Sequence, residues 1–203
     1  MNYLKSIILI FSIENNLYSQ SSIDTLLAST INKYFTTEDY FLKDTIKKEA
    51  FLNKIIIEKL EQNSLYSTNC KYFKNKIILT SIEKQQIIEN LSKDFVWQFP
   101  LENKCKIINT EMACDILDSI NRIGKVPLNK YIKSEISAKE YERLRMKLPY
   151  IVYITNPNYF RNKKYLLVGI TCIGGGLSGT PCHIFVYKKT KTAYKEYINI
   201  KIN

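Results

Sequence analysis

The chain has 203 residues, and its 30 basic against 19 acidic side chains give a formal net charge of +11. This length suits a single domain, and no apolar run approaches the roughly 20 residues that a membrane-spanning helix requires. A single histidine, together with five cysteines of which no pair has zinc-knuckle spacing, argues against a metal site. The few arginines and the lack of a recognised motif argue against a nucleic acid partner.

The first segment has the pattern of a bacterial signal peptide. Lys5 precedes an apolar run over residues 6–13, which has the length of a signal-peptide core, and Ser19 offers a small residue for cleavage. We therefore predict a signal peptide over 1–19, one mature domain over 20–203 and a periplasmic or secreted location. The alternative is a buried N-terminal strand or helix of a cytosolic protein, and Glu14, an unusual acid before the cleavage site, favours it.

The region over residues 20–147 is predicted to be mainly helical. Apolar residues recur there at helical spacing. Two Ser/Thr-x-x-Glu patterns, each typical of a capping box, start helices at Thr80 and Ser137. Helices are expected over 22–35, 38–62, 81–94, 111–120 and 138–147, with a short β-prone run over 76–79.

The composition changes at Pro149, after which β-branched and aromatic runs alternate with turn-forming residues. Turn chemistry occurs around residues 156–158, 161–163 and 189–191. The pattern predicts an antiparallel meander of about four strands in the β-rich part, 149–203. Because the helices would pack on this C-terminal sheet, the fold class is α+β. The four runs cover residues 150–155, 165–172, 182–188 and 193–202.

A glycine-rich loop joins the second and third of these runs. It formally satisfies the G-x-G-x-x-G pattern of dinucleotide sites, but such a site needs a helix after the glycines, and here Pro181 leads into another strand. No cofactor is therefore predicted. The glycines are instead expected to allow positive φ values in a connection between strands. The structural loop residues are Gly174, Gly175, Gly176 and Gly179.

Two cysteines flank this loop. Cys172 and Cys182 stand at positions that can face each other, which makes them the candidate disulfide of an exported protein. Such a bridge would contribute about 2–3 kcal/mol by constraining the unfolded chain. Cys105 with Cys114 is the alternative pair, and Cys70 is the expected free thiol.

Four stretches of the chain carry a recognisable set of motifs, at residues 79–84, 156–165, 174–179 and 186–189. Through them the chain resembles a family of uncharacterised, mostly exported proteins from Bacteroidota-type bacteria. The resemblance spans about residues 78–200 and rests on the helix start and three β-region motifs. In that family the loop reads C-G-G-L-C-G, whereas here it reads GGGLSG, with Gly174 and Ser178 replacing both loop cysteines. If the family's cysteines form a bridge, Cys172 and Cys182 would substitute for it. The resemblance implies export and fold but no chemistry.

The excess of positive charge lies wholly near the C-terminus. Residues 123–203 hold 15 basic and 4 acidic side chains, whereas residues 20–122 hold 14 of each. Such asymmetry attracts anions, although a solvated lysine surface would look the same. Our first hypothesis is an exported, non-enzymatic protein that binds an acidic protein or an anionic envelope component through a basic C-terminal face. An immunity or inhibitor protein is one form of it.

Two alternatives belong to other classes of protein. One is an extracytoplasmic hydrolase whose site is assembled only in the fold, from acids such as Glu140 and Glu142 or from Ser178 with His183. The two glutamates do not share a helix face, which weakens that pair. The other is a structural protein of the envelope. No catalytic, cofactor-binding or metal-binding residue is predicted from the sequence.

Overall fold

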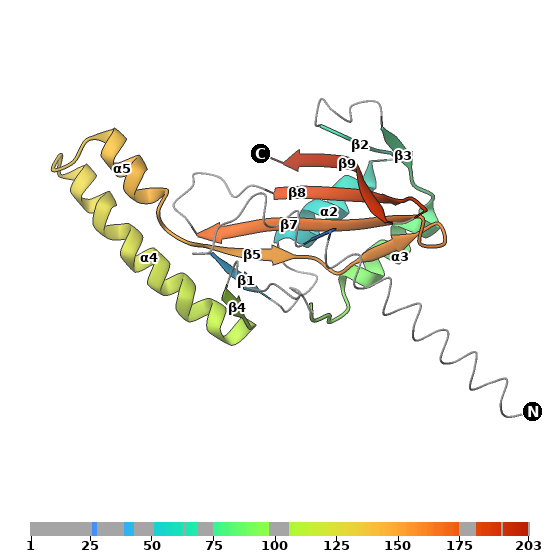
Figure 1. Cartoon of the computed structure of the whole chain (residues 1–203), viewed down its shortest axis with the longest axis horizontal. Coiled ribbons are helices and arrows are strands. Elements are labelled where there is room, and N and C mark those ends of the chain that lie inside the picture. The colour runs from blue at the N-terminus through green and yellow to red at the C-terminus, as the bar shows by residue number, and fades with distance from the viewer. Residues whose placement is uncertain are drawn as a thin grey trace, which may run out of the picture.

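Figure 1 presents a computed structural model of the chain, with the described elements in colour. It describes residues 26–27, 39–42, 51–62, 64–68, 75–97, 106–174, 182–191 and 193–202. The helices in these ranges are α2 (Phe51–Glu61), α3 (Ser81–Leu91), α4 (Thr110–Ile132) and α5 (Ala138–Arg145). The strands are β1 (Tyr40–Leu42), β2 (Ser64–Tyr66), β3 (Lys76–Ile78), β4 (Lys106–Ile108), β5 (Tyr150–Ile154), β6 (Asn158–Phe160), β7 (Tyr165–Gly174), β8 (Cys182–Lys189) and β9 (Tyr194–Ile202).

The central sheet has seven strands in the order β4-β1-β5-β7-β8-β9, with β6 also paired to β7. Strands β5, β7, β8 and β9 form the antiparallel meander that the sequence predicts. Strands β4, β1 and β5 are parallel to one another and extend the sheet beyond it. The α+β class is therefore confirmed, while the expectation of about four strands is too low.

One of the additional strands comes from a segment expected to be a helix. Strand β1 lies inside the helix predicted over 38–62, and only the second part of that predicted helix forms a helix in the structure, α2. In β1, Phe41 pairs with Ile107 of β4 on one side and with Val152 of β5 on the other. Short apolar runs have no periodicity that separates strand from helix, so these distant partners decide the outcome. The helical arrangement predicted for 20–147 is thus interrupted by strands.

Both faces of the sheet are buried. On one face, α2 and α3 contribute a cluster with the odd-numbered side chains of β7, and Ile56 and Leu167 in it are fully buried. α4 packs on the same face near the β4 edge, where it contacts Ile151. On the other face, Leu27 and Trp97 cover the even-numbered side chains of β7. A sheet covered on both faces explains the nearly continuous apolar sequences of β5, β7 and β8.

The predicted starts of two helices are confirmed. The Thr80 hydroxyl accepts a hydrogen bond from the Glu83 N–H, and the Glu83 carboxylate accepts one from the Thr80 N–H, which completes the capping box of α3. Ser137 caps α5 in the same way at Glu140. The Glu140 carboxylate instead binds Arg143, so the reciprocal half of that box is not formed.

Helix α4 is longer than the sequence suggests. It was expected over 111–120 but continues through Gly124 and Pro127 to Ile132. The last turns are held by α5, because Tyr131 stacks on Tyr141 with ring centroids 5.1 Å apart. Packing of this kind outweighs the intrinsic helix-breaking tendency of proline. Among the described helices, none combines the length and apolar character needed to cross a membrane.

Candidate functional site

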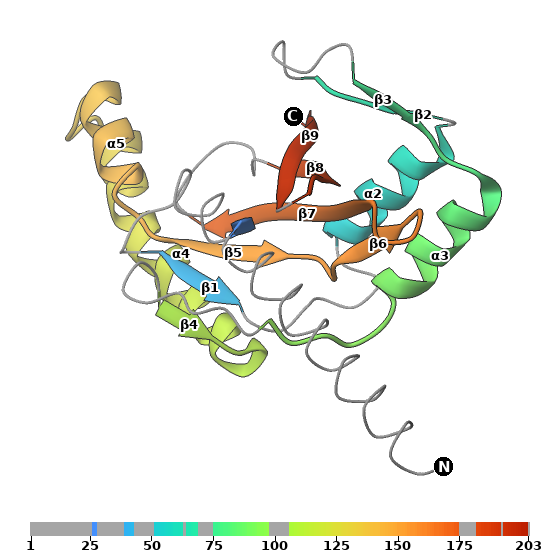
Figure 2. The same cartoon turned by 45° about the vertical axis from the view of Figure 1, so that its right-hand side comes forward.

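Six lysines of the C-terminal part lie at one end of the sheet. The β6–β7 turn and the β8–β9 turn lie side by side there, because the Lys189 N–H donates a 2.8 Å hydrogen bond to the Lys164 carbonyl. This end adjoins α3 (Figure 2). We call it the basic tip, and its residues are Lys163, Lys164, Lys188, Lys189, Lys191 and Lys195. All of them are exposed except Lys188, which is half-buried.

The turn that presents the first two lysines has an unusual backbone. Arg161, Asn162 and Lys163 are consecutive non-glycine residues with φ values of 52°, 53° and 60°. Each such left-handed residue costs of order 1–3 kcal/mol and persists only where surrounding contacts impose it. Two hydrogen bonds hold the turn. Within it, the Lys164 N–H donates to the Arg161 carbonyl, and from the neighbouring strand β9 the Tyr194 hydroxyl donates to the Lys163 carbonyl. Strain retained at an exposed turn is more typical of a functional site than of a plain connection.

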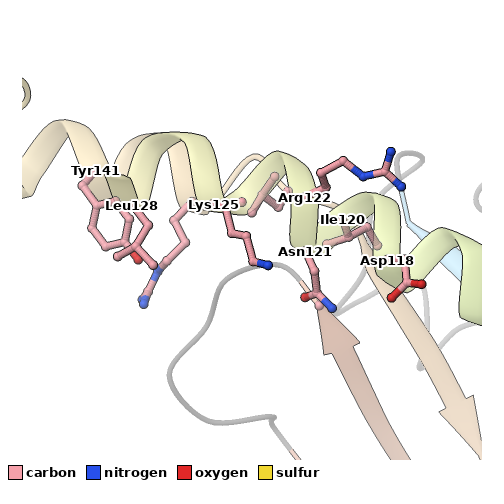
Figure 3. Close-up of a pocket in the computed structure, with 11 residues that line it drawn as sticks. Asp118, Ile120, Asn121, Arg122, Lys125, Leu128 and Tyr141 are labelled. Carbon is pink, nitrogen blue, oxygen red and sulfur yellow. The ribbon is translucent and has the colours of Figure 1, made fainter. Parts of the chain in front are cut away.

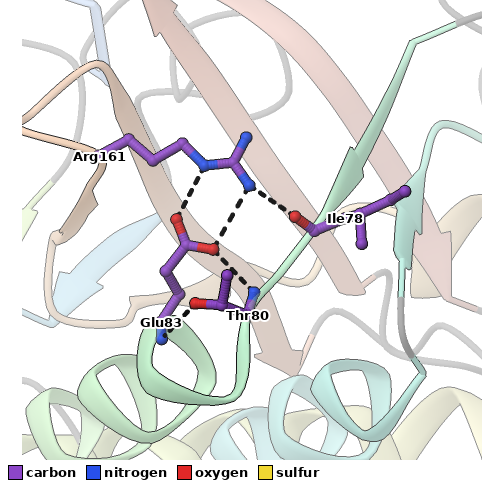
Figure 4. Close-up of polar contacts among 4 residues, drawn as sticks. All are labelled: Ile78, Thr80, Glu83 and Arg161. Carbon is purple, nitrogen blue, oxygen red and sulfur yellow. Dashed lines mark hydrogen bonds and ion pairs between the residues drawn. The ribbon is translucent and has the colours of Figure 1, made fainter.

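Arg161 fixes this turn to helix α3, as Figure 4 shows. Its guanidinium donates to both carboxylate oxygens of Glu83, at 2.8 Å and 3.4 Å, and also to the Ile78 carbonyl. Partial burial by itself raises the pKa of Glu83, but hydrogen bonds from Arg161 and from the Thr80 backbone, with the charge of Arg161, lower the pKa overall. Glu83 therefore caps a helix and anchors a turn 78 residues away.

Like charges adjoin one another in the basic tip. Lys188 and Lys195 lie directly opposite each other on β8 and β9, an arrangement of like charges that destabilises a strand pair. Of the described acids beside the tip, Glu83 forms an ion pair with Arg161, whereas Glu196 accepts a hydrogen bond from the neutral Asn199 amide and keeps its charge. The six lysines outnumber these two carboxylates, so the tip carries a net positive charge.

The chemistry available at the tip follows from its residue types. Arg161 is engaged with Glu83, so the remaining cations are lysines, which act as compact point charges without the bidentate geometry of arginine. Tyrosine rings lie beneath some of them, with the Lys163 and Lys188 ammonium groups 5.9 Å and 5.2 Å from the centroids of Tyr159 and Tyr197. The basic tip is therefore suited to binding an extended anionic surface, and not to holding a single anion in one orientation.

A second candidate is a groove of about 690 Å³ between α4, α5 and the end of β7. Figure 3 shows Asp118, Asn121 and Lys125 on one side of α4, while the Arg122 side chain points away from them. Arg145 contributes from α5, and Ile120, Leu128 and Leu148 are apolar lining residues. This groove was not predicted from the sequence. The recurrence of polar residues at positions 118, 121 and 125, which is helical spacing, was the available signal.

The groove does not supply the constellation that a hydrolase of the predicted kind would need. Asp118 is the one carboxylate among its lining residues. The candidate acids Glu140 and Glu142 lie outside the groove, each in an ion pair with the arginine three residues on, at 2.6 Å and 3.0 Å. His183 is on β8, where its Nδ1 lies 3.0 Å from the Asn199 Oδ1. Ser178 lies outside the described residues.

The cysteines of the predicted disulfide are free thiols in the structure. Cys182 is paired with Thr171, the neighbour of Cys172, and successive residues of a strand point to opposite faces. Cys182 therefore packs with the helix-covered face and Cys172 faces the other side of the sheet. The bridge was predicted because the two cysteines flank the loop at positions that can face each other, whereas in the structure the strand register places them on opposite faces. Cys114 is also free, whereas Cys70 and Cys105 lie outside the described residues.

Of the four glycines predicted to shape the loop, Gly174 lies within the described part of the chain. Gly174 ends β7 with a φ of +99°, a conformation that favours glycine, and a Cβ there would lie 3.0 Å from the Pro149 carbonyl oxygen. The other three loop glycines, Gly175, Gly176 and Gly179, lie outside the described residues, and so does the predicted signal peptide over 1–19.

Comparisons with known proteins add no further constraint. Within the described part of the chain, no group of three or more histidine, cysteine or acidic residues is placed to hold a metal ion. No family model, curated protein or solved structure matches the chain. The family resemblance noted in the sequence therefore stays a prediction.

Proposed function

We propose that the protein is exported and acts without catalysis, by docking its basic tip on an acidic partner outside the cytoplasm. An immunity or inhibitor role, in which the partner is an acidic protein, is the form we favour. One observation carries the proposal: six lysines lie in or next to two adjoining turns, where they outnumber the neighbouring carboxylates of Glu83 and Glu196.

The backbone at the tip supports the same conclusion. A flexible loop could have carried the lysines at no cost in strain, but here Lys163 is in a left-handed turn fixed to α3 through Arg161. A rigid turn loses little conformational entropy when it binds, so affinity is gained without new contacts. Docking of lysines on an acidic surface also accelerates association and makes it sensitive to salt.

The test is capture of partners from the periplasmic extract of the native host by the purified mature protein. The charge-reversal variant K163E/K164E/K189E/K191E should bind a captured protein at least about tenfold more weakly, because like charges across an interface cost several kcal/mol. Binding by the unaltered protein should also weaken as the salt concentration rises. Vesicles containing phosphatidylglycerol serve as the probe for an anionic envelope component.

A matched control separates the tip from overall charge. The variant K130E/K133E/K139E/K147E alters four exposed lysines near α4 and α5 and changes the net charge by the same amount. It should bind as the unaltered protein does. Equal losses in both variants would mean that total charge and not the tip governs binding. No loss in the tip variant would contradict the proposal directly.

A further inference from the structure

The groove between α4, α5 and the end of β7 has an apolar floor. Gly124 of α4 lies so close to Leu148 that a Cβ there would come within 3.1 Å of the leucine Cδ1. A Cβ on Gly174, at the end of β7, would lie 3.5 Å from the Ile120 Cδ1. Ile120 and Leu148 are both buried. The volume of the groove, about 690 Å³, is within the range of sites for small molecules.

Two cations from different helices line the same stretch of this groove. The tyrosine stack described above joins α4 to α5 at one level, and the contact between Gly124 and Leu148 joins the two segments at another. These two contacts show that α4 and α5 run antiparallel. Lys125 on α4 and Arg145 on α5 both fall between the two levels, and both line the groove.

The Arg145 guanidinium is largely withdrawn from water but incompletely paired. Its side chain is 17% exposed, and its Nε is buried without a hydrogen-bond partner among the described residues. Its ion pair with Glu142, 3.0 Å long, is screened by solvent because the glutamate side chain is 48% exposed. Lys125 forms no ion pair with a described residue. A cation withdrawn from water is costly unless an anion compensates it, so this stretch of the groove favours a bound anion.

Apolar side chains adjoin the two cations, whereas the acid of the groove lies farther away. Leu128, which is 38% exposed, is one helical turn beyond Lys125, and the centroid of the Tyr141 ring is 5.8 Å from the Arg145 guanidinium. Asp118 precedes Lys125 by seven residues, which is about 10 Å along the helix axis. Figure 3 shows Tyr141 and Leu128 toward one end of the groove and Asp118 toward the other.

We propose that this groove binds a small organic carboxylate with an apolar body. The carboxylate accepts hydrogen bonds from the Lys125 ammonium and from the outer nitrogens of the Arg145 guanidinium, which has donors beyond those that face Glu142. The apolar body covers Leu128 and the ring of Tyr141. A few convergent polar groups on an apolar lining are the usual form of a small-molecule site. The groove is at the opposite end of β7 from the basic tip in Figure 1, so the proposal does not rest on the proposed function.

Titration of the full ¹⁵N-labelled mature chain with 2-naphthoate, followed by NMR of the backbone amides, tests the proposal. The probe should bind saturably with a Kd of about 1 mM or below, as expected for a ligand of its size. The largest shifts should fall within residues 118–128 and 141–148. The uncharged 2-naphthamide and the small anion acetate should each bind at least about tenfold more weakly, because one lacks the charge and the other lacks the apolar body.

Matched variants assign the binding to the two cations. R145M and K125M should each weaken 2-naphthoate binding at least about tenfold, which corresponds to about 1.4 kcal/mol. R143M and K130M should leave it unchanged, because neither residue lines the groove, although Arg143 is paired with a glutamate three residues away just as Arg145 is.

Thermal unfolding verifies that each variant is folded, and K125M decides the result if R145M is not, because Lys125 is exposed on the helix surface. Four results would overturn the proposal: no saturable binding, equal binding of 2-naphthamide, equal losses in the control variants, or shifts centred on the turns of the basic tip.

Discussion

Glu83 connects two features that are far apart in the sequence. As the third residue of α3 it completes the capping box with Thr80, and through Arg161 it anchors the left-handed turn of the basic tip. Its side chain is 12% exposed, whereas that of Arg161 is 37% exposed, so solvent screens the arginine end of the pair. One carboxylate thus stabilises both a helix start and the surface that we propose for binding.

Replacing Glu83 by glutamine should lower the free energy of unfolding at neutral pH by about 1–2 kcal/mol, less than an unscreened pair would lose. A glutamine side chain can still accept the hydrogen bond from the Thr80 N–H. The lost stability therefore measures the effect of the carboxylate charge and not the loss of the helix cap. In the folded protein the pKa of Glu83 is lowered below its usual 4.5. The stabilisation that the ionised Glu83 gives to the folded state is therefore complete above about pH 4.5, and it is lost as the pH falls through the lowered pKa.

Urea unfolding at a series of pH values measures this effect. The difference between the unaltered protein and E83Q should shrink as the pH falls below about 4.5. E140Q serves as the control, because Glu140 is in a solvent-exposed pair with Arg143 that should add little to stability. A difference that stays constant with pH would mean that the carboxylate charge does not stabilise the fold.

At the scale of the elements, one glycine sets how closely a helix approaches the sheet. A Cβ on Gly169 of β7 would lie 2.7 Å from the Ile56 Cδ1 and 3.0 Å from the Leu52 Cδ1 of α2. Both leucine and isoleucine side chains are buried, so neither can move into solvent. The absence of a side chain at 169 therefore lets α2 pack directly against the backbone of the central strand.

Substituting Gly169 by alanine should destabilise the protein by about 1–3 kcal/mol through overpacking. Ile56→Val removes the methyl group that the new Cβ would meet. The double variant G169A/I56V should therefore lose less than the sum of the two single losses. Equilibrium unfolding of the unaltered protein, the two single variants and the double variant measures the coupling free energy between the two positions. Strict additivity would show that Gly169 and Ile56 do not constrain each other.

At the scale of the whole molecule, the sheet separates two buried regions, and one cysteine lies in each. Burial raises the pKa of both Cys172 and Cys182 to about 12, since the thiolate would be formed in apolar surroundings. The nucleophilic form is then scarce at neutral pH, and access to reagents is blocked as well. The reactivity of each thiol consequently reports on one face of the sheet.

We expect iodoacetamide to leave Cys172 and Cys182 unmodified in the native protein and to modify both once urea has unfolded it. Cys114, which is exposed, should react in the native state. Peptide mapping by mass spectrometry resolves the individual sites. Rapid native labelling of either buried thiol, or a peptide that joins residues 172 and 182, would contradict the strand register described above.

The sequence alone determined those features that depend on neighbouring residues. The capping box at Thr80 and Glu83 and the four runs of the meander are encoded locally, by hydrogen-bonding side chains and by β-branched residues between turn formers. The turn at 161–163 was likewise recognisable, although its left-handed backbone and its attachment to α3 were not. The concentration of lysines toward the C-terminus was visible as composition.

Only the tertiary structure decided which distant segments meet. Strand β1 is extended because β4 and β5 pair with it, α4 passes Pro127 because α5 packs on its last turns, and Cys172 and Cys182 stay apart because their register places them on opposite faces. These outcomes depend on partners tens of residues away, whose contacts outweigh local preference. The basic tip likewise exists only because two separate turns are joined by the fold.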